Sequence, residues 1–303
     1  MFDQRHQPHD SLVGGYVACD DGDPIEGAKR GEQEILYATN AIAIDECTLH
    51  RIHPSTGKIL ADLGTVTTDD GTNVGIFGMC RHRITTNENS TARLLYAINH
   101  LDQLVQLHVE KAEVQVIGNG VGVNGLFDLA CHPSNSELVY SYTAVSNQVV
   151  VINTTTGLGQ VLPSTLPEAD AVSMDFDWAG TGMHPQHKID GSSLWLLQNG
   201  KLLSTIDITT GAQLNSTILK GGTGGSLVPV KQRNGSIRRP DRCTRDKNNL
   251  LYSTFFEADP SSMWLVDVED ASIKESFATE LDAAYALAFL YETSRSEPLQ
   301  EKP

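Results

Sequence analysis

Short apolar runs that each carry one aromatic residue recur along the chain at intervals of roughly 50 residues. These runs are ILYATN (35–40), LLYAIN (94–99), LVYSYT (138–143), LWLLQN (194–199) and LLYSTF (250–255). In the segments that follow them, apolar and polar residues alternate between Gly, Asn and Thr turns. Because a period of two is typical of short antiparallel strands, the pattern predicts an all-β chain built from repeats.

A second set of strand candidates precedes these runs. GIFGMCRH (75–82) and GLFDLACH (125–132) match closely, and AVSMDFDW (171–178) is a looser relative. Four strands in each unit are typical of a β-propeller blade. The repeats resemble the broad propeller superfamily, especially the YVTN or SMP-30-like kind, over residues 35–293. The resemblance implies a fold and no particular activity.

The first unit lacks its inner strand, whereas the C-terminal segment AAYALAFLYE (283–292) has no aromatic run after it. If this segment completes the first unit, the ring closes with five blades. The segment could also form a helix, because Thr279 and Asp282 are spaced like a capping box. We favour the strand, because an unclosed propeller leaves sheet edges unpaired. Six blades are the alternative if residues 10–34 add a sheet, and the polar segments 1–34 and 294–303 are predicted to lie outside the propeller.

The composition narrows the classes of partner. The 303 residues are 40% hydrophobic and carry a net charge of −16, which argues against binding nucleic acid or an anionic membrane surface. No run reaches the ~18 apolar residues of a membrane span. Five cysteines without close pairs, and no visible signal peptide, predict an intracellular, soluble protein with reduced thiols. On this interpretation the Asn-x-Ser/Thr sequences at Asn89, Asn153, Asn215 and Asn234 are chance.

Candidate metal and nucleophile motifs have simpler structural explanations. Three His-x-x-His pairs occur, at 6/9, 50/53 and 184/187, but residues three apart on a strand point to opposite faces, so His50 and His53 cannot share an ion there. Cys80 and Cys131, each near a histidine, are interpreted as repeat-derived core residues. The Gly-rich stretch GNGVGVNG (118–125) lacks the strand-to-helix context of a phosphate loop. We therefore expect no metal or other cofactor.

One motif points to catalysis. An Asp-Pro before a Tyr-containing strand resembles the opening of five-bladed arabinanase-like glycosidases, in which an N-terminal Asp is the general base, and this residue would be Asp23. Such enzymes need a second carboxyl group as proton donor. Asp170 and Asp175 are candidates. A glycosidase-like or lactonase-like propeller hydrolase is therefore the alternative function.

The leading hypothesis is a non-catalytic propeller, a subunit or scaffold, that binds a protein partner or a small ligand on its loop face. We expect acidic residues from several loops to gather on that face. The Gly-rich and then basic segment 220–247 is predicted to be a contact element and not part of the core. The residues assigned to the face are Asp69, Asp70, Glu168, Asp170, Glu257, Asp259, Glu280, Asp282, Arg238, Arg239 and Arg242.

Overall fold

The chain divides into two compact units, Met1–Arg30 and Gly31–Pro303, and every residue described below belongs to the second. The computed structural model describes residues 32–53, 56–81, 94–168, 172–176, 194–199, 201–220, 235–238, 250–255, 262–267, 271–278, 280–281 and 284–293. In this part of the chain all regular structure is β-strand. No helix long and apolar enough to cross a bilayer occurs among these residues.

The strands follow one another along the chain with short gaps. They are β1 (Glu32–Ala43), β2 (Glu46–Ile52), β3 (Ile59–Thr65), β4 (Thr67–Thr68), β5 (Ile76–Cys80), β6 (Leu94–Asn99), β7 (Leu104–His108), β8 (Glu113–Val116), β9 (Leu126–Cys131), β10 (Leu138–Thr143), β11 (Gln148–Asn153), β12 (Gly159–Thr165), β13 (Val172–Phe176), β14 (Leu194–Gln198), β15 (Leu202–Ile206), β16 (Gln213–Ile218), β17 (Gly235–Arg238), β18 (Leu250–Phe255), β19 (Ser262–Asp267), β20 (Ser272–Ala278) and β21 (Ala284–Thr293).

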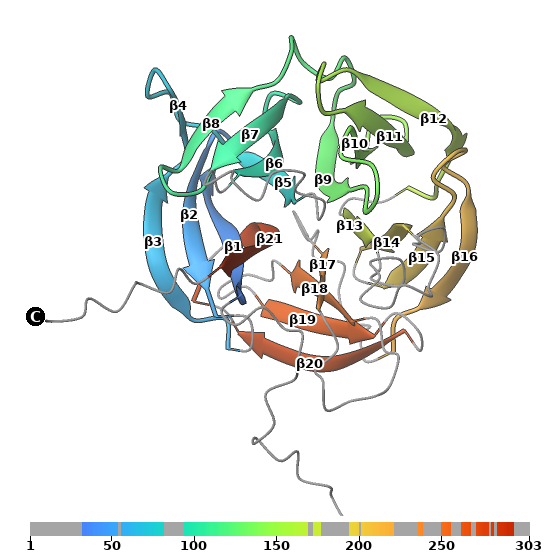
Figure 1. Cartoon of the computed structure of the whole chain (residues 1–303). Coiled ribbons are helices and arrows are strands. Elements are labelled where there is room, and N and C mark those ends of the chain that lie inside the picture. Colours follow the sequence, from blue (N-terminus) through green and yellow to red (C-terminus); the bar gives the residue numbers. More distant parts are fainter. Residues whose placement is uncertain are drawn as a thin grey trace, which may run out of the picture. The chain divides into compact units, whose positions relative to one another are not determined.

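The described strands form five sheets, whose orders are β21-β1-β2-β3, β4-β8-β7-β6-β5, β9-β10-β11-β12, β13-β14-β15-β16 and β17-β18-β19-β20. All pairings are antiparallel except the parallel pair of β4 and β8. The first strands of successive sheets contact one another in a cycle, from β21 to β5, β9, β13, β17 and back to β21. These strands lie nearest the centre in Figure 1. The predicted β-propeller arrangement is confirmed.

Apolar side chains on both faces of a sheet hold neighbouring sheets together. On β2, for example, Cys47 and Leu49 pack against Met79, Leu95 and other residues of the next sheet. Separate clusters of buried residues then join the second sheet to the third, the third to the fourth and the fourth to the fifth. Alternate residues of each strand contact the sheets on opposite sides, because successive side chains point to opposite faces. This two-sided burial explains the apolar runs found in the sequence.

The outer edges of the sheets are joined by a repeated hydrogen bond. The turn between the third and fourth strands of each sheet meets the end of the outer strand of the preceding sheet, or the chain just beyond it. The five bonds are Thr67 N to Ala112 O (3.0 Å), Gly159 N to Val121 O (2.9 Å), Ser164 N to Thr210 O (2.9 Å), Lys220 N to Ala271 O (2.6 Å) and Glu280 N to Gly57 O (3.3 Å). The last bond connects the fifth sheet to the first, so the series closes.

The C-terminal segment is a strand, as predicted from the need to close the first unit. β21 pairs with β1 from Glu32↔Thr293 to Asn40↔Ala284. The Thr39 hydroxyl oxygen also accepts a hydrogen bond from Ala286 N at 3.0 Å. The helical alternative for residues 283–292 is therefore wrong, because leaving the edge of β1 unpaired costs more free energy than the local helical preference provides.

The basic segment 220–247 contains a strand that the sequence did not predict. β17 is the first strand of the fifth sheet and pairs with β18 from Gly235↔Ser253 to Arg238↔Leu250. Residues 235–238 of this segment therefore belong to a sheet, while the rest of it, apart from Lys220, lies outside the described residues, so its contact role stays a prediction. The six-bladed alternative concerns residues 10–34, of which only 32–34 are described, and these belong to β1.

Candidate functional site

Turns between the second and third strands of three successive sheets carry exposed apolar side chains. Ile42 lies near the end of β1 and Ile44 in the turn that follows it, with exposed fractions of 59% and 70%. Leu101 follows β6 and is 61% exposed, and Val145 follows β10 and is 75% exposed. Single exposed apolar residues are ordinary, but a set at equivalent turns is a candidate contact surface.

Hydrogen bonds tie the turn after β6 to the chain just before β5, the first strand of the same sheet. His100 N donates to Gly75 O (2.9 Å), and Gly75 N donates to His100 Nδ1 (3.2 Å). A Cβ at Gly75 would collide with the carbonyl oxygen of Ile44, so glycine allows the two sheets to approach there. The turns at 42–45, 99–103 and 144–147 thus belong to one end of the first three sheets, and we call this surface the turn face.

Asp102 connects the second turn of the turn face to the third sheet. Its carboxylate accepts Gly125 N at 2.9 Å and Leu126 N at 2.7 Å, which are the residues where β9 begins in the neighbouring sheet. Ala144 N then donates to Gly125 O at 2.9 Å. Leu101 and Val145 are therefore presented by turns with fixed positions relative to each other, and binding through them requires little ordering of the backbone.

The acidic residues assigned to the loop face are spread more widely than expected. Asp69 and Asp70 are exposed in the turn after β4, which lies beside β8 at the outer edge of the second sheet. The Asp70 carboxylate accepts hydrogen bonds from Thr68 Oγ1 and from Thr72 N (3.1 Å), which lower its pKa. Glu280 also lies at an outer edge, where its carboxylate accepts Ile59 N at 2.8 Å.

The other assigned residues add little to an acidic cluster. Glu168 is exposed after β12. A further acidic residue, Asp45, is exposed within the turn face itself. Of the remaining assigned residues, Arg238 has only its backbone described. The others lie outside the described part of the chain, and these are Asp170, Glu257, Asp259, Asp282, Arg239 and Arg242. The described carboxylates at outer edges therefore stabilise turns and sheet contacts.

A buried carboxyl group lies on the inner strand β9. Asp128 is 1% exposed and has a φ of 54°, a conformation that Asp and Asn adopt more readily than most residues. Its Oδ1 accepts Leu129 N at 2.7 Å, and its Oδ2 accepts Met174 N of β13 at 2.6 Å. Burial raises the Asp128 pKa well above its ordinary value, and the charge of Asp175 adds to this.

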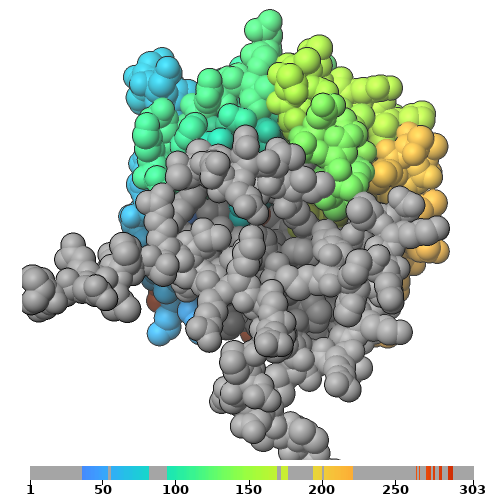
Figure 2. Space-filling model, viewed as in Figure 1, coloured from blue at the N-terminus to red at the C-terminus, as the bar shows by residue number. Residues whose placement is uncertain are grey.

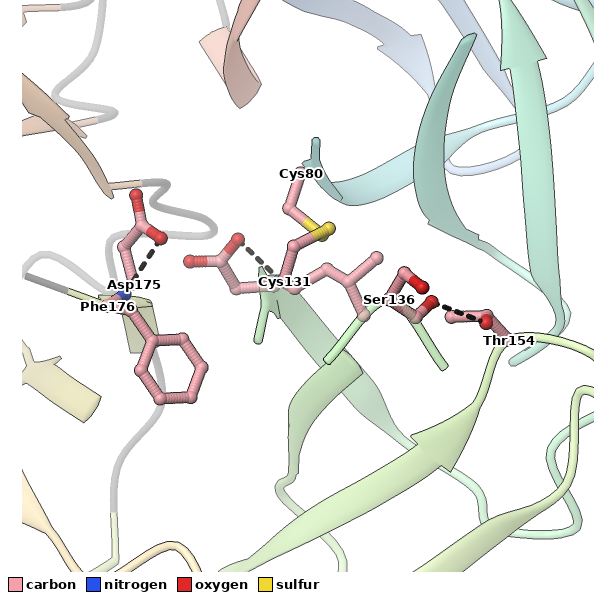
Figure 3. The surroundings of a disulfide bond; sticks show 8 residues. Cys80, Cys131, Ser136, Thr154, Asp175 and Phe176 are labelled. Carbon is pink, nitrogen blue, oxygen red and sulfur yellow. Dashed lines mark hydrogen bonds between the residues drawn. A yellow bond between two sulfur atoms is a disulfide. The ribbon is translucent and has the colours of Figure 1, made fainter. Parts of the chain in front are cut away.

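Both oxygens of Asp128 accept hydrogen bonds from backbone donors on two sheets, so this residue connects the sheets. Asp175, the described member of the alternative catalytic set, is half-buried on β13, and its Oδ1 accepts Phe176 N at 2.8 Å (Figure 3). Asp23 and Asp170 lie outside the described residues. The catalytic assignment therefore stays a prediction.

A disulfide links the inner strands of the second and third sheets. Cys80 at the end of β5 and Cys131 at the end of β9 are bonded, with their Cα atoms 5.5 Å apart (Figure 3). The prediction of reduced thiols is therefore wrong for these two residues, and neither can act as a nucleophile. Cys47 remains a free, buried thiol whose pKa is raised to about 12, chiefly by burial.

His132, which follows Cys131, has a structural environment. Its Nδ1 accepts hydrogen bonds from Asn135 N (3.0 Å) and Ser134 N (3.2 Å). Its ring lies 5.4 Å from that of Phe176, and burial lowers the His132 pKa. A ring nitrogen that accepts two backbone hydrogen bonds is suited to holding a turn in its neutral form.

Of the three histidine pairs, the structure describes His50 and His53. His50 is buried on β2, and its Nε2 lies 2.7 Å from Thr48 Oγ1, whereas His53 beyond the strand is exposed. His50 Nδ1 is 3.8 Å from a carboxylate oxygen of Asp62. Among the described residues no group of three or more His, Cys, Asp or Glu side chains could hold a metal ion, and the pairs at 6/9 and 184/187 lie outside them.

The disulfide and Asp128 were missed in the sequence, although a signal for the disulfide was present. Cys80 and Cys131 end the two strands that match most closely between repeats, and matching inner strands of neighbouring sheets lie side by side. The same alignment places Gly78 at the position of Asp128. The backbone of Asp128 packs so closely against Gly78 that a Cβ there would collide with it.

No protein-family model matches this chain, and no curated protein matches its sequence. The resemblance to YVTN or SMP-30-like repeats therefore stays a prediction. The chain is similar in fold to a glutaminyl cyclase from Myxococcus xanthus, with 14% identity and a TM-score of 0.40 over 71% of this chain and 70% of that one.

Two further solved structures show the same weak likeness. Hydrazine synthase from Kuenenia stuttgartiensis has 12% identity and a TM-score of 0.37, over 67% of this chain and 49% of that one. Apo AztD from Citrobacter koseri has 11% identity and a TM-score of 0.35, over 84% and 62%. These similarities concern the fold, and no activity follows from them. The class of protein is a β-propeller.

Proposed function

We propose that this protein is a five-bladed propeller, closed by β21, that binds a partner protein through its turn face. The cycle of contacts among first strands and the bond between Glu280 and Gly57 support one closed ring. A closed ring supplies a rigid frame, and such frames with varied loops commonly serve recognition.

The observation that carries the proposal is the set of exposed apolar side chains at equivalent turns. Ile44, Leu101 and Val145 are each more than half exposed, and hydrogen bonds to the start of β9 fix the backbone that presents Leu101 and Val145. Exposed apolar groups on a pre-organised surface favour association, because binding then removes apolar area from water with little loss of conformational entropy.

The partner's chemistry follows from charge. The chain has a net charge of −16, and Asp45 is an exposed acidic residue within the turn face. A partner segment with apolar side chains flanked by Lys or Arg would complement both features, and the long-range field would speed its association at low salt. We therefore commit to a basic, partly apolar protein segment as the occupant.

The test uses synthetic peptides and a matched pair of variants. A library with Leu, Val and Tyr flanked by Lys and Arg is compared with the same library carrying Glu and Asp, with binding measured by fluorescence anisotropy. The double variant Ile44→Ser, Leu101→Ser should weaken binding of the basic peptides at least about tenfold, as loss of two apolar contacts would. The control variant Leu214→Ser, Ile218→Ser changes two equally exposed apolar residues on β16 and should bind normally.

Several results would contradict this proposal. Equal binding of the basic and acidic libraries, or equal losses in the turn-face and β16 variants, would exclude specific recognition by this face. Turnover of a glycoside or lactone that is abolished by Asp23→Asn would favour the hydrolase instead. Tight binding of a small molecule that leaves peptide binding unchanged would move the ligand site away from the turn face.

A further inference from the structure

Asn215 lies on an exposed edge of the fourth sheet. It begins the sequence Asn-Ser-Thr (215–217) within β16, the last strand in the order of its sheet, so one side of that strand is unpaired. The Asn215 side chain is exposed, and none of the other described residues is hydrogen-bonded to it. β16 lies at the rim of the molecule in the views of Figure 1 and Figure 2.

The neighbours of Asn215 leave this edge unusually apolar. Leu214 is 60% exposed and Ile218 is 74% exposed. An exposed strand edge with apolar side chains can pair with another chain and promote aggregation, and proteins usually cover or block such edges. A large hydrophilic group attached to Asn215 would block pairing along β16.

Asn153, which also begins an acceptor sequence, has a different environment. Its Oδ1 accepts hydrogen bonds from Thr155 N and Thr156 N, both at 2.9 Å, and so closes the turn after β11. The hydroxyl of the intervening Thr154 is mostly buried and donates to Ser136 O at 2.8 Å (Figure 3). Hydrogen bonds in and beside the turn therefore give residues 153–155 a structural role. Among the described residues, no such hydrogen bond involves the side chains of residues 215–217.

The disulfide provides independent support. Stable disulfides between cysteines distant in sequence are typical of oxidising compartments, such as the lumen of the secretory pathway, and are rare in the cytosol. Cys80 and Cys131 are 51 residues apart and join two sheets. N-glycosylation takes place in the same oxidising compartment, and the predicted intracellular location gave no reason for the disulfide.

We propose that Asn215 is an N-glycosylation site and that the protein matures in an oxidising secretory compartment. The co-reactant is a lipid-pyrophosphate-linked oligosaccharide. The Asn215 side-chain nitrogen forms a bond to the anomeric carbon of the first sugar, the bond from that carbon to the phosphate oxygen breaks, and the lipid pyrophosphate leaves with the electron pair. The proton lost from the amide nitrogen goes to the solvent or to the leaving group, so no electrons are exchanged.

The test expresses the full chain in eukaryotic cells, once with a cleavable secretion signal and once without it. Mass spectrometry of the secreted protein should find the peptide that contains Asn215 carrying a glycan, which an amidase releases to leave Asp. The variants Asn215→Gln and Thr217→Val should lose this glycan, whereas Thr217→Ser keeps the acceptor sequence and should retain it. Without the signal, no glycan should be present.

The same secreted sample is digested without reduction to find the peptide pair joined through Cys80 and Cys131. A secreted, folded protein with unmodified Asn215, or a glycan pattern that neither Asn215→Gln nor Thr217→Val alters, would overturn the glycosylation site. Free thiols at both cysteines in the secreted protein would overturn the argument for an oxidising compartment. Increased light scattering by Asn215→Gln relative to the glycosylated protein would support the protective role at the β16 edge.

Discussion

Among single residues, Asp128 makes the most consequential contact between sheets. Replacing it with Ala leaves Leu129 N and Met174 N without their acceptor in a dry environment and forces a residue with a simple Cβ to adopt a positive φ. We expect the free energy of unfolding to fall by about 1–3 kcal/mol for the lost hydrogen bonds, measured by urea denaturation. Asp69→Ala, at an exposed position in the turn after β4, is the control and should change stability little.

Asp128 also predicts a pH dependence. The pKa of Asp128 is raised in the folded protein. At a pH above the ordinary pKa of an aspartate, the unfolded state therefore releases a proton that the folded state still holds. The stability contributed by the protonated group is therefore lost as pH increases through the folded-state pKa. The stability of the native protein relative to Asp128→Asn should decrease with increasing pH. A constant difference between the two across the pH range would contradict the raised pKa.

His50 gives the opposite slope at acid pH. Burial lowers its pKa, although the nearby charge of Asp62 opposes this, so the unfolded state binds a proton more readily than the folded state does. Stability is then lost as pH falls below the ordinary pKa of histidine, about 6.5. His50→Gln should show a shallower decline in melting temperature between about pH 7 and pH 5 than the native protein. A melting temperature that declines as steeply in His50→Gln as in the native protein would contradict this prediction.

Between elements, β5 and β9 pack closely against each other. Gly78 lets the two strands pack backbone against backbone, Phe77 and Phe127 stack with ring centres 6.1 Å apart, and the disulfide joins the strand ends. Three different interactions thus fix the same pair of inner strands. This pair is the best-defined contact between sheets at the centre of the molecule.

The disulfide should stabilise this contact measurably. The double variant Cys80→Ser, Cys131→Ser should lose about 2–4 kcal/mol of unfolding free energy, because the crosslink restricts the unfolded chain. Urea denaturation with and without a reducing agent measures this. Reduction should lower the stability of the native protein to that of the double variant and leave the variant unchanged. An equal effect of the reducing agent on both proteins would show that this bond does not contribute.

For the whole molecule, the proposed ring closure depends on β21. Deletion of residues 279–303 removes the strand that pairs with β1 along its length, and it also removes Glu280, which bonds to the turn after β2. We expect this truncation to prevent cooperative unfolding, measured by circular dichroism and calorimetry, because it exposes β1 and the adjoining apolar surface. Deletion of 294–303 starts beyond β21 and should be tolerated. Equal stability of the two truncated proteins would disprove closure by β21.

Local patterns determined the strands of this protein. The alternation of apolar and polar residues and the matching segments GIFGMC and GLFDLAC predicted most of the first and second strands of the sheets. Sheets that are buried on both faces need apolar residues of this spacing. The position of β21 could also be predicted from the sequence, because pairing with this segment satisfies the backbone hydrogen-bonding groups at the edge of β1. β17 was not, because Gly235–Arg238 has a polar sequence whose pairing with β18 depends on the space left by its neighbours.

Only the tertiary structure decided which residues from different repeats meet. Cys80 and Cys131 pair because β5 and β9 lie side by side, and the Asp128 carboxylate reaches Met174 because the next inner strand lies beside it. The acidic residues, in contrast, were expected to gather, yet Asp70 and Glu280 lie at the outer edges of different sheets. The sequence determined the alternation of side chains along each strand through local geometry. Contacts between sheets depend on twist and on the packing of sheets around one another, which no single repeat encodes.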